Sequence, residues 1–376
     1  MAVLLVLTVG AAAIVRKGEP LTRAAVATVV GLPAVATGAG IALPHLSKTG
    51  MSVVAVAGSV ALVAGAALVS YGSVGLIRST CGWWRVGTGA VLLAVTMIGL
   101  FTGGQAVAAT NVPRTGLRVE TPADRGFRYE DATFRTPDDV ELAGWYLPAA
   151  NRTGVILLHG AGSTRSDVLD HAAVLARHGY GVLMVDARGH GRSDGRAMDF
   201  GWYGDEDVAG AVSYLQGRPD VDPGRIAVIG LSMGGEEAIG AAATSPAIRA
   251  VVAEGATQRV AGDSAFLEDA YGVRGRIQRQ VNGLTTALTD LLTDAQPPVT
   301  LRAAAAATAL RPILLITAGE VPDETYAARF IQRGNLSVQV WKVEGAGHTQ
   351  ALRTHPDEWN RRVTAFIDGA LGRAAG

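Results

Sequence analysis

The sequence predicts membrane-spanning helices followed by an α/β domain built on a mostly parallel sheet. Long uncharged runs are concentrated before residue 111, although hydrophobic residues make up 49% of the whole 376-residue chain. After residue 126, short apolar runs alternate with helical patterns, which is the order of a doubly wound sheet covered on both faces. We therefore expect an all-α transmembrane region at 1–110, a polar linker at 111–126 and a second domain at 127–376.

Four apolar stretches mark the first region, at residues 1–15, 24–43, 52–77 and 87–109. The last three reach the roughly 20 residues that a helix needs to cross a hydrocarbon core, whereas the first is short. Their many glycines and alanines suit close helix packing in lipid. Buried helices of a soluble core would show a polar face, which these stretches lack. We expect three spans, or four if residues 1–15 also cross.

Basic residues predict the orientation of these spans. Three of them lie within residues 16–23, before the second stretch, and Arg78 and Arg85 lie between the third and fourth stretches. The loop between the second and third stretches carries only Lys48. By the positive-inside rule the richer segments face the cytoplasm, so the chain leaves its last span outside.

Charge and cysteine content exclude several classes of partner. Lys plus Arg equals Asp plus Glu at 33 each, and the second half shows no basic stripe, so nucleic acid is not an expected partner. A single cysteine, Cys81, excludes an internal disulfide and a cysteine-based zinc site. The acidic run at 204–207 suits the start of a helix better than a metal site. We expect neither a metal nor a cofactor.

In the second domain, predicted strands alternate with predicted helices. Two alternating runs predict antiparallel strands, and six apolar runs predict buried parallel ones. The expected strands are 127–136, 140–149, 154–159, 181–186, 225–230, 250–255, 312–319 and 337–343, with helices at about 165–179, 206–217 and 233–244 and from about 324 and 357. Residues 258–308 interrupt the series as a helical, cap-like insert that we expect to shape a pocket.

The stretch "GLSMG" carries the strongest chemical signal. Ser232 lies between a predicted strand and a predicted helix, and Gly230 and Gly234 leave room for a turn that strains the serine backbone. A serine at this place can instead cap the following helix. Because reactive groups gather at the carboxyl ends of parallel strands, the nucleophile is the favoured interpretation.

A nucleophilic serine needs a base and an anion hole. His348, in "VEGAGHTQ" after the last strand, is the expected base. His159 and His190 sit in glycine turns, where we expect structural roles. The backbone N–H groups of Met233 and Ala161 are the expected donors to an oxyanion, because they follow the nucleophile and the first parallel strand.

The acid that orients His348 has several candidates. One strand end carries Glu320, Asp323 and Glu324, and any of them can reach the imidazole. We favour Asp323, followed by Glu320. Glu254 is a further candidate because it also ends a predicted strand.

These motifs resemble those of the α/β-hydrolase superfamily. The segments "LLHGAG", "DARGHGRSDG", "GLSMGG", "AGEVPDE" and "GAGH" follow the family's order within residues 127–372. The resemblance implies Ser232 as nucleophile, His348 as general base, and Met233 and Ala161 as oxyanion donors. The acid loop departs from the family pattern, because "EVPDE" offers two spacings for the acid.

The expected function is that of a multi-pass membrane serine hydrolase whose catalytic domain lies outside the cytoplasm. It would cleave carboxylic esters of small molecules or membrane lipids through an acyl-enzyme. An acyltransferase or a peptidase would use the same triad. A non-catalytic binding module is the third alternative.

Overall fold

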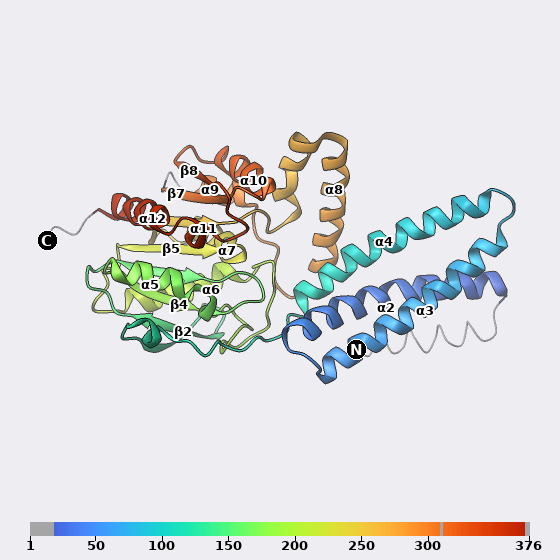
Figure 1. The fold of residues 1–376 in the computed structure, drawn as a ribbon, viewed down its shortest axis with the longest axis horizontal. Coiled ribbons are helices and arrows are strands. Elements are labelled where there is room, and N and C mark those ends of the chain that lie inside the picture. The colour runs from blue at the N-terminus through green and yellow to red at the C-terminus, as the bar shows by residue number, and fades with distance from the viewer. Residues whose placement is uncertain (1–18, 309–310, 373–376) are drawn as a thin grey trace. The chain divides into compact units, whose positions relative to one another are not determined.

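The computed structural model describes residues 19–308 and 311–372 (Figure 1). Contacts between residues divide the chain into two units. A helical unit extends to Pro113 and includes Leu284–Leu292, and a sheet unit comprises Arg114–Gly283 and the chain from Thr293 onward. The first apolar stretch of the sequence, 1–15, lies outside the described residues.

The helical unit contains three long helices that match three of the apolar stretches. They are α2 (Pro20–Lys48), α3 (Val53–Ser79) and α4 (Trp84–Thr110). Each is long and apolar enough to cross a membrane. From residue 19 onward, three helices of spanning length therefore precede the sheet.

Glycines set the close packing of α2 against α3. A Cβ atom added to Gly65 would lie 2.4 Å from the backbone nitrogen of Val35, and one added to Gly38 would lie 2.2 Å from that of Leu62. Only glycine fits at such distances. The glycine-rich composition thus lets the two helix backbones meet directly, which is how small residues stabilise helix pairs in lipid.

The sheet unit contains one eight-stranded sheet with the order β1-β2-β4-β3-β5-β6-β7-β8. The pairs β1–β2 and β2–β4 are antiparallel, and every other pair is parallel. The strands are β1 (Glu130–Arg135), β2 (Glu141–Leu147), β3 (Gly154–Leu158), β4 (Gly181–Val185), β5 (Ile226–Leu231), β6 (Ile248–Glu254), β7 (Ile313–Ala318) and β8 (Val338–Val343). The predicted mostly parallel, doubly wound sheet is confirmed.

Helices cover both faces of this sheet. Alternate strand residues face opposite sides, so Leu157 and Ile156 belong to two different apolar clusters. One cluster contains residues of α5 (Leu169–Arg177), α11 (Ala351–Thr354) and α12 (Pro356–Leu371). The other contains residues of α6 (Gly204–Gln216), α7 (Met233–Thr244), α9 (Leu301–Ala307) and α10 (Pro322–Gln332).

The insert and one helix start differ in detail from the sequence expectation. Residues 258–308 hold a 3-10 turn (Ala261–Ala265), α9 and the long helix α8 (Phe266–Asp290), which is kinked at Gly272 with φ of 57°. Helix α10 begins at Pro322, since proline is preorganised for a first helical position. Asp323 and Glu324 therefore lie in a first helical turn rather than in a loop.

Substituting Gly65→Val tests the α2–α3 packing. The added side chain would overlap the backbone of α2, so we expect the thermal midpoint of the detergent-solubilised chain to fall by about 3–10 °C. Gly99→Val is the matched control, because no atom lies within 4 Å of a Cβ at Gly99. Equal midpoints for the two variants, measured by far-UV circular dichroism, would contradict the packing.

Candidate active site

Ser232 lies on a strained turn between β5 and α7. Its φ is 54° and its ψ is −120°, a conformation that residues with a Cβ rarely adopt. A Cβ at Gly230 would lie 2.0 Å from the carbonyl oxygen of Gly234, so this turn requires glycine. The Ser232 side chain makes no capping hydrogen bond to α7. Its hydroxyl is therefore presented away from the helix, which favours the nucleophile over the cap.

A chain of two hydrogen bonds joins Ser232, His348 and Glu324. The Ser232 Oγ lies 2.9 Å from His348 Nε2, and His348 Nδ1 lies 2.6 Å from Glu324 Oε1. The imidazole is about half exposed, whereas the Glu324 side chain is buried. With the hydrogen on Nδ1, the ring donates to the carboxylate and accepts from the hydroxyl. This is the geometry of a serine nucleophile with its base and orienting acid.

The structure does not bring Asp323, the favoured acid, to the imidazole of His348. Its carboxylate accepts a hydrogen bond from the hydroxyl of Tyr271 in α8. Successive helical residues point about 100° apart, so Asp323 and Glu324 cannot face the same group. Glu320 does not reach the imidazole either: its side chain is exposed, and within the described residues its hydrogen bond is that of its backbone N–H to the carbonyl of Ala346.

Glu254, the remaining alternative, is buried but does not contact the imidazole. Its carboxylate accepts from the N–H of Ala351 and from the indole of Trp359. Glu324, by contrast, also accepts from the N–H of Ala318 at 2.7 Å through its second oxygen. Two hydrogen bonds thus fix the Glu324 carboxylate in the orientation that His348 needs.

A helical pattern could have identified Glu324 from the sequence. Its position is buried together with Ala327, Ala328 and Ile331 on one face of α10. These spacings of three, four and seven residues define the inward stripe of a helix. Asp323 falls outside that stripe. The side of the helix on which a residue lies, rather than its distance in sequence from the strand end, determines which carboxylate faces His348.

Glu324 sets the proton affinity of the base. The hydrogen bond to this carboxylate raises the pKa of His348 above its ordinary value of 6.5, and this effect exceeds the opposing effect of partial burial. The carboxylate therefore stabilises the protonated form of His348.

The expected oxyanion donors lie on two segments near the serine. Met233 begins α7 directly after Ser232, and Gly160 lies so close to the elbow that its added Cβ would be 3.4 Å from the Ser232 Cβ. Within the described residues, no hydrogen bond uses the N–H of Ala161 or Met233. The N–H after Ala161 donates to Asp199 Oδ1 at 3.0 Å, which fixes this loop.

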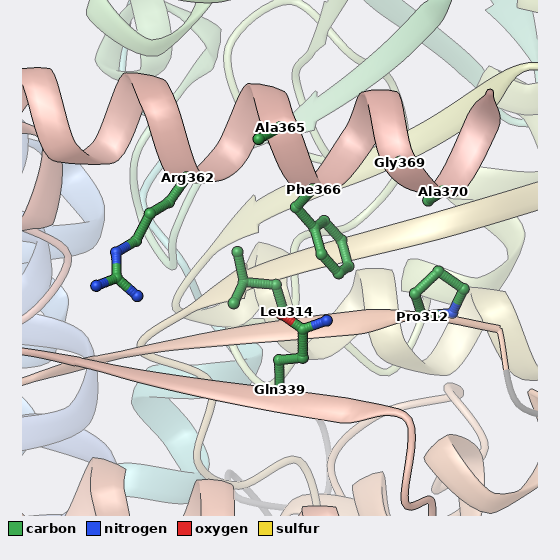
Figure 2. Close-up of a pocket in the computed structure, with 8 residues that line it drawn as sticks. All are labelled: Pro312, Leu314, Gln339, Arg362, Ala365, Phe366, Gly369 and Ala370. Atoms are coloured by element: carbon green, nitrogen blue, oxygen red, sulfur yellow. The ribbon is translucent and has the colours of Figure 1, made fainter. Parts of the chain in front are cut away.

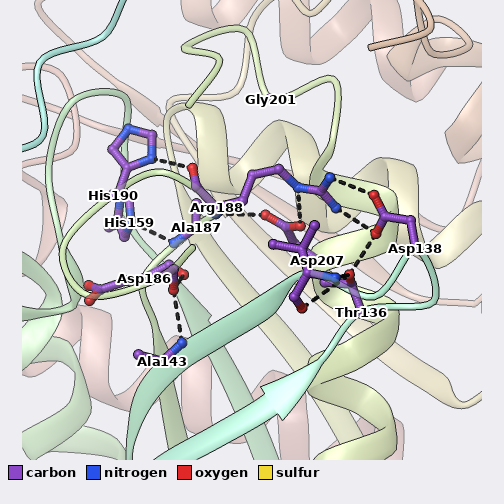
Figure 3. A network of polar contacts seen from close by, with 12 residues as sticks. Thr136, Asp138, Ala143, His159, Asp186, Ala187, Arg188, His190, Gly201 and Asp207 are labelled. Atoms are coloured by element: carbon purple, nitrogen blue, oxygen red, sulfur yellow. Dashed lines mark hydrogen bonds and ion pairs between the residues drawn. The ribbon is translucent and has the colours of Figure 1, made fainter. Parts of the chain in front are cut away.

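The two histidines of the glycine turns belong to a polar network (Figure 3). His159 Nε2 accepts from the N–H of Ala187 at 3.1 Å, and burial lowers the pKa of His159 to about 3. His190 Nδ1 contacts the carbonyl of Arg188 at 3.1 Å. The Arg188 guanidinium binds Asp207 at 2.7 Å. These contacts give both histidines the structural role expected from the sequence.

A separate hollow lies between α12 and the strands β7 and β8 (Figure 2). Its volume is about 540 Å³, and Leu314, Gln339, Arg362 and Phe366 are among its lining residues. None of the three hydrogen-bonded residues Ser232, His348 and Glu324 lines it. This hollow is therefore not the space in front of the nucleophile.

Parts of the sequence are similar to those of known hydrolases and of an uncharacterized protein. The model of a family described as serine aminopeptidase, S33, matches residues 149–311, a stretch that contains Ser232 and ends before Glu324 and His348. An uncharacterized protein of Mycobacterium tuberculosis is 35% identical over 119 residues, covering 31% of this chain and 42% of that protein. A thiohydrolase of Aspergillus aculeatus is 34% identical over 128 residues, covering 33% and 40%. The chain spans about two fifths of the length of these relatives.

Solved structures extend the similarity to the whole sheet unit. An esterase of Pyrococcus furiosus has a TM-score of 0.56 and 25% identity, covering 70% of this chain and 99% of its own. An α/β hydrolase from Penicillium has a TM-score of 0.51 at 21% identity, covering 65% and 99%, which supports the fold alone.

Exchanging each acid for its amide separates Glu324 from Asp323. Glu324→Gln would offer the wrong hydrogen-bonding group to His348, and we expect turnover of a short chromogenic ester to fall about 10³- to 10⁴-fold. Asp323→Asn is the matched control and should leave turnover near the wild-type value. Equal losses in both variants, or a loss confined to Asp323→Asn, would contradict the assignment of the acid.

The fold and the site lead to the same assignment. The strand order, the elbow between β5 and α7, and the serine, acid and histidine order along the chain all match the superfamily that the sequence motifs resemble. The esterase from Pyrococcus furiosus carries the same fold over nearly its full length. The sheet unit, preceded by three apolar helices, belongs to the α/β-hydrolase superfamily.

Proposed function

We propose that the chain is a membrane-anchored serine hydrolase that cleaves carboxylic esters through an acyl-enzyme. The observation that carries this proposal is the contact chain from Ser232 through His348 to Glu324, at 2.9 and 2.6 Å. A structural serine would not need a strained backbone and a histidine held by a buried carboxylate. The names of the relatives, a thiohydrolase and an esterase, also describe attack on acyl carbonyl groups.

The chemistry follows from the positions of these groups. Ser232 Oγ attacks the ester carbonyl while His348 Nε2 takes its proton, and the N–H groups of Ala161 and Met233 donate to the oxyanion. The imidazolium then gives the proton to the departing alcohol, which leaves an acyl group on Ser232. A water molecule, deprotonated by the same nitrogen, releases the carboxylic acid and restores the hydroxyl.

A peptidase is the second candidate, because the matching family is described as serine aminopeptidase. The same nucleophile and base would serve an amide substrate, and His348 would then protonate an amine rather than an alcohol. An acyltransferase differs only in the acceptor of the acyl group. Both alternatives are decided by the substrate and the product rather than by the triad.

Lipid-like esters are the substrate class that we favour. Three helices long enough to span a membrane precede the sheet unit in the same chain and would anchor it at a lipid surface. Helix α8 of the insert exposes Val273, Ile277 and Leu284, whose spacings of four and seven residues follow one helical face. Two of the three arginines of α8, Arg276 and Arg279, pair with Glu268, so the exposed apolar side chains are the feature that suits a lipid surface.

A panel of acyl substrates tests the proposed activity. We expect the purified full chain to hydrolyse esters, faster for long acyl chains presented in lipid vesicles than for short soluble ones, with little cleavage of aminoacyl anilides. His348→Ala should lower these rates by roughly 10⁴-fold or more. Products analysed with and without an added alcohol distinguish hydrolysis from transfer. Faster cleavage of the anilides would favour the peptidase, and an unaffected His348→Ala variant would contradict both.

We also propose that the sheet unit lies outside the cytoplasm, on the basis of the charge bias around the spans. A membrane-impermeant ester should then be hydrolysed by intact cells that express the wild-type chain. Cells that express Ser232→Ala provide the background. Wild-type activity that appears only after the cells are permeabilised would contradict this orientation.

A further inference from the structure

Glu254 is a buried carboxyl group that the proposed mechanism does not use. It is the last residue of β6, and in the sheet it pairs with Leu231 of β5 and with Ile316 of β7. Its side chain is 2% exposed. A carboxyl group in such a place is costly unless hydrogen bonds and nearby charges compensate for the lost water.

The backbone at Glu254 and Gly255 contacts both Ser232 and His348. Its carbonyl accepts a hydrogen bond from the N–H of Ser232 at 2.7 Å. The next residue, Gly255, has φ of 72°, and a Cβ there would lie 2.8 Å from Cε1 of His348. One peptide segment thus fixes the serine backbone and lies against the imidazole ring.

The side chain of Glu254 holds the segment that carries His348. Its Oε1 accepts from the N–H of Ala351 at 2.8 Å, and its Oε2 accepts from the indole Nε1 of Trp359 at 3.3 Å. Ala351 begins α11 three residues after His348, and Trp359 is fully buried in α12. Glu324 therefore fixes the imidazole from one side, while Glu254 fixes the chain that follows it.

We propose that Glu254 is a positioning residue: its carbonyl holds Ser232, its carboxylate holds the loop of His348, and together they set the distance between nucleophile and base. The kinetic consequence rests on the proposed function. The placement and protonation of His348 do not, so they can be measured without turnover.

Charge adds a second effect to the positioning. Burial raises the pKa of Glu254 to about 7, although its two hydrogen bonds favour the ionised form. The charged groups with the largest effects on His348 are Glu324 from α10, Glu236 from α7 and Glu254 itself, and all three raise the pKa of the imidazole. Removing the negative charge of Glu254 must therefore lower the pKa of His348.

The direction of the pH effect follows from the role of the base. His348 takes a proton only when it is neutral, so activity is lost as the pH falls through its pKa. A lower pKa moves the acidic limb of the kcat/KM profile to lower pH. A residue that only filled the core would change the stability of the fold without moving this limb.

Glu254→Gln in the full chain is the test. The amide keeps the side-chain volume and can still accept from Ala351, but it carries no charge and presents its NH2 group to the Trp359 indole. The probe is diethyl pyrocarbonate, which modifies neutral imidazole, with modification of His348 followed by mass spectrometry across pH. We expect the titration of His348 to move down by roughly half a pH unit. Glu320→Gln, the same exchange at an exposed site of a neighbouring loop, should leave it unchanged.

Kinetics on a short ester provide the second readout. We expect kcat of Glu254→Gln to fall about 10- to 100-fold with KM little changed, because a misplaced base slows proton transfer rather than binding. If the titration of His348 and the kcat of Glu254→Gln both equal those of the wild-type chain, the proposal is overturned. If the wild-type chain hydrolyses nothing, the proposed function fails while the titration still tests the placement.

Trp359→Phe keeps the experiment decisive if Glu254→Gln does not fold. This exchange removes one donor to the carboxylate, which raises the pKa of Glu254 and leaves less of it ionised near neutral pH. The titration of His348 should shift in the same direction as in Glu254→Gln, by a smaller amount. An unchanged titration in Trp359→Phe would then overturn the proposal.

Discussion

The site depends on the passage of the chain from β5 into α7 through a single residue, Ser232, at positive φ. Such a conformation costs of order 1–3 kcal/mol for a residue with a Cβ. The cost is offset by the surroundings, since every residue of β5 is buried and the Ser232 N–H donates to the carbonyl of Glu254 in β6. The strained turn directs the hydroxyl toward His348 and leaves the next N–H, that of Met233, without an acceptor in the described part of the chain.

Buried carboxyl groups surround this turn. Glu236, Glu237, Glu254 and Glu324 are all less than one-tenth exposed. Burial raises the pKa of Glu236 and of Glu254 to about 7, and that of Glu237 well above its usual range. The hydrogen bonds of Glu236 to the N–H groups of two residues after β6 tie α7 to the same strand that holds Ser232. Glu236, Glu254 and Glu324 thus link α7, β6, α10 and the histidine loop, and their ionised forms favour a cation on His348.

The sequence was sufficient for the features that depend on local pattern. Apolar runs placed the strands, and the strand ends placed Ser232 and His348, because a parallel sheet brings its carboxyl ends to one edge. The carboxyl group that contacts His348 lies one residue beyond the favoured Asp323, since Pro322 starts a helix and Glu324, three positions before Ala327, then belongs to the inward face. The strand order and the partners of Glu254 come from contacts distant in sequence, which periodicity in one segment does not encode.

The central claim is that Ser232 is a nucleophile activated by His348 and Glu324. Its most direct test is covalent labelling of the full chain with a fluorophosphonate, followed by peptide mass spectrometry. The account predicts a single phosphonyl adduct on Ser232, absent in Ser232→Ala and formed far more slowly in Glu324→Gln. No adduct on the wild-type chain, or an equal adduct elsewhere in Ser232→Ala, would contradict it.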